Sequence, residues 1–223
     1  MTTPAPAAPG ILSVGLTGGI ACGRTTVCRM LAGWGAFVVD MDVVAHELTG
    51  PGGAAVGAVV AAFGEQTRDA SGGVNRRTLG ARVFSDAAAR ARLEAILHPM
   101  ILERASALIA GFARRVERGV AITDAALLVE TGGYRRYQRL VVVACDPPIQ
   151  LRRLMERDGL GEGEARARIA AQAPLSEKVA LADYHIDTSG TLARTEERVR
   201  EVWALLVEDL ESLPDLPRRR RVS

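Results

Sequence analysis

Lysine, cysteine, aromatic side chains and long apolar runs are all scarce in this chain of 223 residues. The three cysteines, Cys22, Cys28 and Cys145, show no C-x-x-C spacing, which argues against a disulfide framework or a zinc site. No uninterrupted apolar run approaches the roughly 20 residues that a membrane-spanning helix needs. Residues 1–10 are rich in proline and alanine but lack the apolar core of a signal peptide. We therefore expect a cytoplasmic protein with no membrane partner.

Positive charge comes almost entirely from arginine, because Lys178 is the only lysine. The formal net charge is +2, and the run Arg218–Arg221 supplies four positive charges, so the rest of the chain is slightly acidic. An arginine run that follows prolines is typical of a solvated tail, and we expect no specific nucleic-acid partner. The composition predicts a disordered leader over 1–10, a single domain over 11–212 and a basic disordered tail over 213–223.

The most informative motif is a glycine-rich segment from Gly18 to Thr26, which lies between a short apolar run and an amphipathic run. Its spacing fits the phosphate-binding loop G-x-x-x-x-G-K-[ST], with Gly18, Gly23 and Thr25 in the required places. Strand, glycine-rich turn and helix is the order in which backbone N–H groups cradle phosphates. Arg24 stands where the motif has lysine, so the positive charge is carried by a wider, planar group.

Acidic residues follow two of the predicted strands. Residues 36–39 predict a buried strand followed by Asp40 and Asp42, whose side chains would point the same way on an extended backbone. Residues 120–123 predict another buried strand, which ends on Asp124. The carboxyl ends of parallel strands face the ligand crevice. The first pair could be two surface acids, but its position beside a phosphate loop favours a catalytic or metal role at least as strongly, and we expect Asp124 to hold Mg²⁺ or its water.

Further strand patterns at 11–16, 140–144 and 184–187 alternate with helical patterns. This alternation predicts an α/β fold with a parallel β-sheet core flanked by helices on both faces. Arginines near a glycine-containing corner at 158–163 predict a lid over about 152–175 that closes on phosphates. For each individual arginine, a place on the helix surface of an arginine-rich protein is an equal alternative.

Between about 43 and 118, helical patterns follow one another without a strand among them. This order predicts an inserted helical part that binds the substrate. We expect Ser85 to cap one helix, His98-Pro99 to end it, and a separate long helix to span 100–117.

A series of segments stands in a recognisable order between Ile11 and Leu210. These are Gly15–Ile20, Val39–Asp42 with Ala45-His46, Leu97–Ile101, Asp124–Glu130, Gln150–Asp158, Ala170–Gln172 and Ile186–Gly190. Their order resembles that of the dephospho-CoA kinase family, and the pairing of Thr17–Ile20 with Leu97-His98-Pro99 is more specific than the phosphate loop alone. The resemblance implies a P-loop kinase with a nucleotide core, a helical CoA-binding part and a lid. Its expected reaction is phosphorylation of the ribose 3′-hydroxyl of dephospho-CoA by ATP with Mg²⁺, which gives coenzyme A and ADP in the last step of CoA biosynthesis.

The resemblance also assigns roles position by position. Asp42 corresponds to the catalytic acid that orients the ribose hydroxyl, and Arg24 stands at the position of the catalytic loop cation. Thr25 and Asp124 are expected to hold Mg²⁺, and Asp40, His98 and Glu130 to contact the substrate. The residues expected to bind ATP are Gly18, Gly19, Ala21, Cys22, Gly23, Arg24, Thr25, Thr26 and Arg157.

The chain departs from the family pattern inside the phosphate loop. Arg24 replaces the lysine, and Ala21 and Cys22 replace the usual glycine and serine. A guanidinium keeps the charge of lysine but not its compact geometry. The residues therefore leave two alternatives beside a fully active kinase: an enzyme with activity reduced by Arg24, and a non-catalytic nucleotide- or CoA-binding relative. Another nucleoside or nucleotide kinase is a lower alternative, and the oligomeric state is not indicated.

Overall fold

The computed structural model describes residues 9–213, without the side chains of Phe84 and Ser85. The predicted leader and basic tail lie outside the described residues except at their inner ends. The chain divides into two compact units: unit 1 contains the residues up to Val39 and from Ile109 onward, and unit 2 is Asp40–Leu108. The substrate and lid roles predicted for 43–118 and 152–175 stay predictions.

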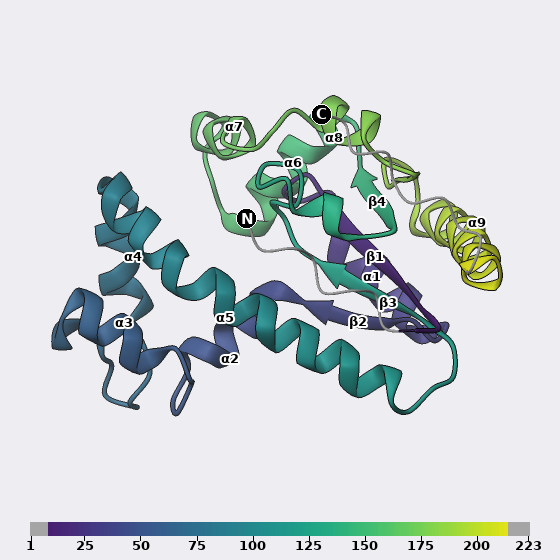
Figure 1. Cartoon of the computed structure of the whole chain (residues 1–223). Helices are drawn as coiled ribbons and strands as arrows, with labels where there is room; N and C mark the ends of the chain where they lie inside the picture. Colours follow the sequence, from purple (N-terminus) through teal and green to yellow (C-terminus); the bar gives the residue numbers. More distant parts are fainter. Residues whose placement is uncertain (1–8, 214–223) are drawn as a thin grey trace. The chain divides into compact units, whose positions relative to one another are not determined.

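Unit 1 is built on a five-stranded sheet with the strand order β2-β3-β1-β4-β5 (Figure 1). Strand β1 pairs in parallel with both β3 and β4, and β4 pairs in parallel with β5. The register places Leu16 of β1 opposite Asp124 of β3, so the phosphate loop and Asp124 follow adjacent strands at the same edge. The strands are β1 Ile11–Gly18, β2 Phe37–Asp40, β3 Gly119–Asp124, β4 Arg139–Ala144 and β5 Tyr184–Asp187.

Helices and a loop segment cover both faces of this sheet. On one face, α1 and α9 bury an apolar stripe against the strands, with Leu31 of α1 and Val202 of α9 fully buried there. On the other face, Leu140 and Val142 of β4 pack with side chains from 125–137 and from α8. The predicted α/β fold with a parallel sheet covered on both faces is confirmed. The helices of unit 1 are α1 Arg24–Gly33, α6 Pro147–Asp158, α7 Glu162–Ala170, α8 Leu175–Ala180 and α9 Leu192–Glu211, with a 3₁₀ turn, η2, at Gly133–Arg136.

Unit 2 is helical. Its core gathers Val59 and Phe63 of α3, Leu79 of α4 and Ala89 of α5 around one apolar cluster. The elements are α2 Met41–Thr49, α3 Val56–Phe63, the 3₁₀ turn η1 Glu65–Thr67, α4 Arg76–Ser85 and the larger part of α5 Ala87–Ala113 (Figure 1).

Three local predictions in this region were wrong. The helix expected to stop at His98-Pro99 continues through Pro99, and it ends at Ala113 rather than at Glu117. Leu97 packs against the apolar cluster of unit 2, and this packing outweighs a local proline cost of about 3 kcal/mol. Ser85 was expected to cap this helix, but the cap is Asp86. The Asp86 carboxylate accepts hydrogen bonds from two first-turn N–H groups of α5 at 2.9 and 3.0 Å.

Within residues 9–213, α5 is also the one helix long and apolar enough to cross a membrane. This criterion uses length and composition alone and is weak evidence for a span. Arg104 of this helix forms an ion pair with Glu47 of α2 at 3.6 Å. The absence of a membrane partner stays a prediction.

Candidate active site

The backbone of the glycine-rich loop follows the conformation that phosphate cradles require. A Cβ on Gly18 would meet the carbonyl oxygen of Val143 at 2.2 Å, so the loop leaves β1 against the backbone of β4. Gly23 has a φ of 84° and caps α1, which begins at Arg24. Ala21 has a φ of 59°, in the left-handed region that alanine adopts at a cost of roughly 1–2 kcal/mol. Thr26 donates its N–H to the carbonyl oxygen of Gly23 at 3.0 Å, and the N–H groups that precede it at the start of α1 are in the place where helices commonly bind an anion.

Side chains from three distant segments fix this loop. Gln172 accepts the N–H of Ile20 at Oε1 (2.8 Å), and Gln150 donates from Nε2 to the carbonyl oxygen of the same residue (3.0 Å). Thr188 donates from Oγ1 to the carbonyl oxygen of Cys22 at 2.9 Å. The loop backbone is therefore held in place by the protein itself, which lowers the cost of ordering it around a ligand.

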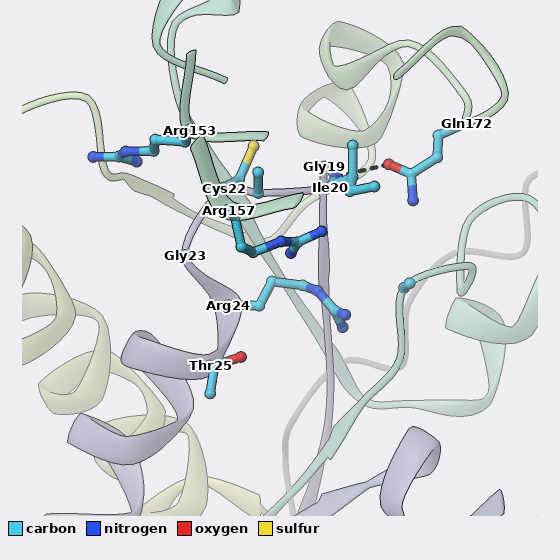
Figure 2. A pocket seen from close by; sticks show the side chains of 11 residues that line it. Gly19, Ile20, Cys22, Gly23, Arg24, Thr25, Arg153, Arg157 and Gln172 are labelled. Atoms are coloured by element: carbon cyan, nitrogen blue, oxygen red, sulfur yellow. Dashed lines mark hydrogen bonds between the residues drawn. The ribbon is translucent and has the colours of Figure 1, made fainter. Parts of the chain in front are cut away.

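A pocket of about 440 Å³ opens over the loop and is lined by residues of unit 1. Figure 2 shows the guanidinium groups of Arg24 and Arg157 directed into the same space, while Arg153 points away from them. Two cations and a helix N-terminus favour a ligand with several negative charges, such as a polyphosphate. The lining residues are Gly19, Ile20, Ala21, Cys22, Gly23, Arg24, Thr25, Ala126, Arg153, Arg157 and Gln172.

The Arg24 guanidinium forms an ion pair with the carboxylate of Asp124, from Nη1 to Oδ1. The two side chains are 18% and 7% exposed, so water screens the pair only weakly. The residue expected to bind phosphate and the residue expected to hold Mg²⁺ thus contact each other. Thr25 follows Arg24 in the first turn of α1, and its hydroxyl lies in the lining of the same pocket (Figure 2).

Arg157 lies near the end of α6, where the lid was predicted to begin. Its Nε donates to Oδ1 of Asp158 at 2.7 Å, and this hydrogen bond raises the pKa of the guanidinium above its usual value. Asp158 also accepts a hydrogen bond from Arg168 of α7 at 3.2 Å. The corner between α6 and α7 is therefore tied by a shared carboxylate, and Arg157 keeps its charge.

Glu130, expected to contact substrate, is bound within unit 1. Its Oε1 lies 2.7 Å from Nζ of Lys178 and accepts the N–H of Ala173 at 3.1 Å. Burial raises the pKa of this carboxyl, but the hydrogen bonds from lysine and backbone outweigh it, so the pKa is lowered below its usual value. The motif that contains Glu130 could not have predicted this ion pair, because its partner, Lys178, lies far along the chain.

The remaining predicted residues, Asp40, Asp42 and His98, belong to unit 2. Asp40 caps α2, because its Oδ1 accepts the N–H groups of Asp42 (2.8 Å) and Val43 (3.1 Å). The expected extended backbone at this pair was wrong, since the helix begins at Met41 and places Asp42, exposed, in its first turn. His98 is exposed on α5. The catalytic and substrate roles of these residues stay predictions.

Comparison with known proteins identifies the family. The family model of dephospho-CoA kinase matches residues 12–194. The dephospho-CoA kinase of Geobacter sulfurreducens is 46% identical over 191 residues, which cover 86% of this chain and 96% of the relative. That of Thermobifida fusca is 41% identical over 202 residues, covering 91% of this chain and 100% of the relative. The chain belongs to the dephospho-CoA kinase family.

Solved structures agree with this family membership at the level of the fold. The protein TT1252 from Thermus thermophilus superposes with a TM-score of 0.71 at 30% identity, covering 90% of this chain and 97% of that one. A dephospho-CoA kinase from Campylobacter jejuni gives a TM-score of 0.60 at 21% identity, with coverages of 88% and 97%. The predicted P-loop kinase fold and the resemblance to dephospho-CoA kinases are both confirmed.

Cys22, one of the departures from the dephospho-CoA kinase pattern, is fully buried beneath the loop. Its sulfur lies 3.4 Å from that of Cys145, which follows β4. The hydrogen bond to Cys145 and burial raise the pKa of the Cys22 thiol. Cys22 is therefore an uncharged packing residue, as its small size predicts.

Sequence reasoning missed the residues that hold the loop: Gln150, Gln172, Thr188 and Lys178. The first three lie inside segments that carry the dephospho-CoA kinase resemblance, but spacing alone gives no sign that they bind the loop backbone. Lys178 lies outside those segments, and its one signal is that it is the only lysine in the chain.

Proposed function

We propose that this member of the dephospho-CoA kinase family transfers the γ-phosphoryl group of ATP to the ribose 3′-hydroxyl of dephospho-CoA, giving coenzyme A and ADP. One observation carries the proposal: the family match extends over a chain whose phosphate loop is held in place beneath a pocket into which the side chains of Arg24 and Arg157 point. Phosphoryl transfer needs in-line placement and neutralisation of charge more than covalent chemistry.

The phosphate loop supplies most of what the reaction needs from unit 1. Backbone N–H groups at the start of α1 bind the phosphate oxygens of ATP, and the Arg24 guanidinium neutralises charge on the transferred group. Arg157 adds a second cation from the lid side of the pocket. Loss of one such contact typically costs about 3 kcal/mol, or at least a hundredfold in rate.

The donor set beside Arg24 fits Mg²⁺. The Thr25 hydroxyl and the Asp124 carboxylate are hard oxygen ligands, and the Asp124 side chain reaches the residue next to Thr25. Mg²⁺ commonly takes one or two protein oxygens together with phosphate oxygens and water, so two such donors suffice. The ion would neutralise charge on the β- and γ-phosphates and align them. The ion pair with Arg24 engages Oδ1 of this carboxylate and would compete with that role.

Asp42 is the carboxylate that we assign to the acceptor hydroxyl, because an exposed acid in the first turn of α2 can accept a proton or orient a donor. Asp40 supports it by capping the same turn. We assign substrate contact to His98 as well, on the strength of the Leu97-His98-Pro99 motif. Such a reaction on soluble substrates is consistent with the expected place of the protein in the cytoplasm.

A non-catalytic nucleotide- or CoA-binding protein is the second candidate, and the Arg24–Asp124 ion pair favours it. A cation that holds the Mg²⁺ carboxylate opposes the arrangement needed for transfer. Such a protein would bind ATP without producing CoA.

The decisive experiment incubates purified protein with ATP, Mg²⁺ and dephospho-CoA and separates CoA and ADP by chromatography. Parallel reactions contain adenosine or nucleoside monophosphates as acceptors. We expect CoA to form and the other acceptors to give little product. Nucleotide binding without CoA would establish the second candidate, and preferential phosphorylation of another acceptor would establish a different nucleoside or nucleotide kinase.

A further inference from the structure

The single lysine of the chain occupies a fully buried position. Lys178 lies in α8 and is 0% exposed. Its ammonium contacts three oxygens: Oε1 of Glu130 at 2.7 Å, the carbonyl of Ala126 at 3.2 Å and the carbonyl of Gly18 at 3.3 Å. An ammonium has three N–H donors, so these acceptors satisfy it completely. Lys178 therefore has no donor left to bind a phosphate in place of the missing loop lysine.

The three acceptors come from segments that border the phosphate pocket. Gly18 opens the phosphate loop, and Ala126 lies two residues after Asp124 and lines the pocket. Glu130 extends the connection to a third segment, because it also accepts the N–H of Ala173. Gln172, the residue before Ala173, contacts the phosphate loop because its side chain accepts a hydrogen bond from the N–H of Ile20.

We propose that Lys178 is a positioning residue for ATP, which acts by locking the start of the phosphate loop to the segments after β3 and after α7. This inference rests on the proposed kinase function only for its kinetic readout, because nucleotide binding tests it directly. The ammonium fixes the carbonyl of Gly18, so the peptide groups that follow it are already aimed for phosphate. Through Glu130 and Ala173, the same cation fixes the segment that carries Gln172.

Loss of the Lys178 ammonium should produce a specific kinetic signature. Removing the ammonium leaves the partly buried Glu130 carboxylate without its cation and takes one hydrogen bond from the carbonyls of Gly18 and Ala126, of which the latter keeps the Thr17 hydroxyl, and these losses cost stability. Stability loss alone would affect both substrates alike below the unfolding transition. A misplaced phosphate loop would weaken ATP selectively, because the proposed function assigns the loop to the phosphates of ATP.

The test replaces Lys178 by methionine, which has similar length and no charge, and uses Arg139→Met as the matched control. Arg139 forms a comparably buried ion pair with Asp209 at 2.8 Å, in the same unit but outside the pocket lining. We expect Lys178→Met to raise the KM and the calorimetric Kd for ATP by about tenfold, the equivalent of one charged hydrogen bond, with a change below about twofold in KM for dephospho-CoA. Arg139→Met should lower the melting temperature and leave the ATP constants within about twofold of wild type.

Equal ATP constants in Lys178→Met and wild type would overturn the proposal, as would an equal loss of ATP affinity in Arg139→Met. If Lys178→Met does not fold, Glu130→Gln decides, because it keeps an oxygen acceptor and removes the charge. It should weaken ATP by about threefold, a part of the full effect. A change confined to KM for dephospho-CoA would instead assign Glu130 to the substrate and refute the proposal. Because ATP binding is measured without an acceptor, failure of the kinase assay would leave this test intact.

Discussion

Arg24 offers the sharpest perturbation of the candidate active site. Its guanidinium pairs with Asp124 beneath the phosphate pocket, and both side chains are largely shielded from water. Productive binding of MgATP requires Arg24 to face phosphate and Asp124 to face the metal, so the ion pair competes with the substrate. Lysine at this position would carry the same charge on a compact ammonium, which forms a single, more easily exchanged hydrogen bond with a carboxylate.

The magnitude follows from the energy of that competition. Hydrogen bonds to charged groups contribute about 1.5–3 kcal/mol each. If lysine relieves about half of this, near 1.1 kcal/mol, then kcat/KM for MgATP rises about sixfold in Arg24→Lys. Arg24→Met removes the cation altogether and should lower kcat/KM by about a hundredfold, as for the loss of one transition-state contact. It should also destabilise the fold by about 3 kcal/mol, because Asp124 loses a buried partner.

The assay is steady-state turnover with dephospho-CoA saturating and MgATP varied, at a temperature where urea titration shows all three proteins folded. Arg24→Lys should exceed wild type, and Arg24→Met should fall well below it. A rate for Arg24→Lys at or below wild type would refute the idea that the ion pair limits ATP binding. A rate for Arg24→Met equal to that of wild type would remove Arg24 from the reaction.

Three further outcomes are expected. Ala21→Gly should stabilise the protein by about 1 kcal/mol in urea unfolding, since Ala21 has a positive φ. The control Ala167→Gly, on the exposed face of α7, should destabilise it by about 1 kcal/mol. A loss of stability in both variants would contradict backbone strain at Ala21. Burial opposes ionisation of Glu130, but hydrogen bonds from Lys178 and backbone N–H groups outweigh it, so the pKa of this carboxyl is lowered in the folded protein. The stability that Glu130 gives the fold is therefore complete above its usual pKa of 4.5 and is lost as pH falls through the lower folded value. Glu130→Gln should flatten the acid side of the curve of urea midpoint against pH, and an unchanged acid limb would show that another group dominates. Asp42→Asn should abolish turnover but leave the calorimetric affinity for ATP intact, and full turnover would exclude its catalytic assignment.

Sequence patterns located the strands of unit 1 closely, because each is a short run of buried apolar residues that leaves little choice of conformation. The pattern at 184–187 coincides with β5, and that at 140–144 falls one residue short of β4. The helices around Pro99 could not be placed in the same way. A proline is a local signal for a helix end, whereas the continuous α5 depends on packing against α3 and α4, which no local window contains.

In the candidate site too, local features could be predicted from the sequence and long-range contacts could not. The glycine spacing placed the phosphate loop and the first turn of α1, because the required backbone shape is local. The Arg24–Asp124 and Lys178–Glu130 ion pairs join residues that are 100 and 48 positions apart. The sequence around one partner gives no indication of which residue the other partner is. Their existence depends on the sheet order, which brings β3 beside β1 and is not contained in the individual motifs.

The two cations most closely tied to the phosphate loop show why arginine and lysine are not equivalent in this chain. Arg24 lies at the edge of a pocket, where its wide guanidinium carries the positive charge of the loop and contacts Asp124. Lys178 sits in a closed site with three oxygen acceptors, which match the three donors of an ammonium; a guanidinium there would bring five donors and leave two buried without partners. A chain that otherwise uses arginine has its only lysine at the position where the count of buried acceptors favours it. Arginine thus carries the charge of the loop, and lysine holds its geometry. The absence of a lysine from the loop does not by itself mean that a function is missing, because charge and geometry are assigned to two different residues.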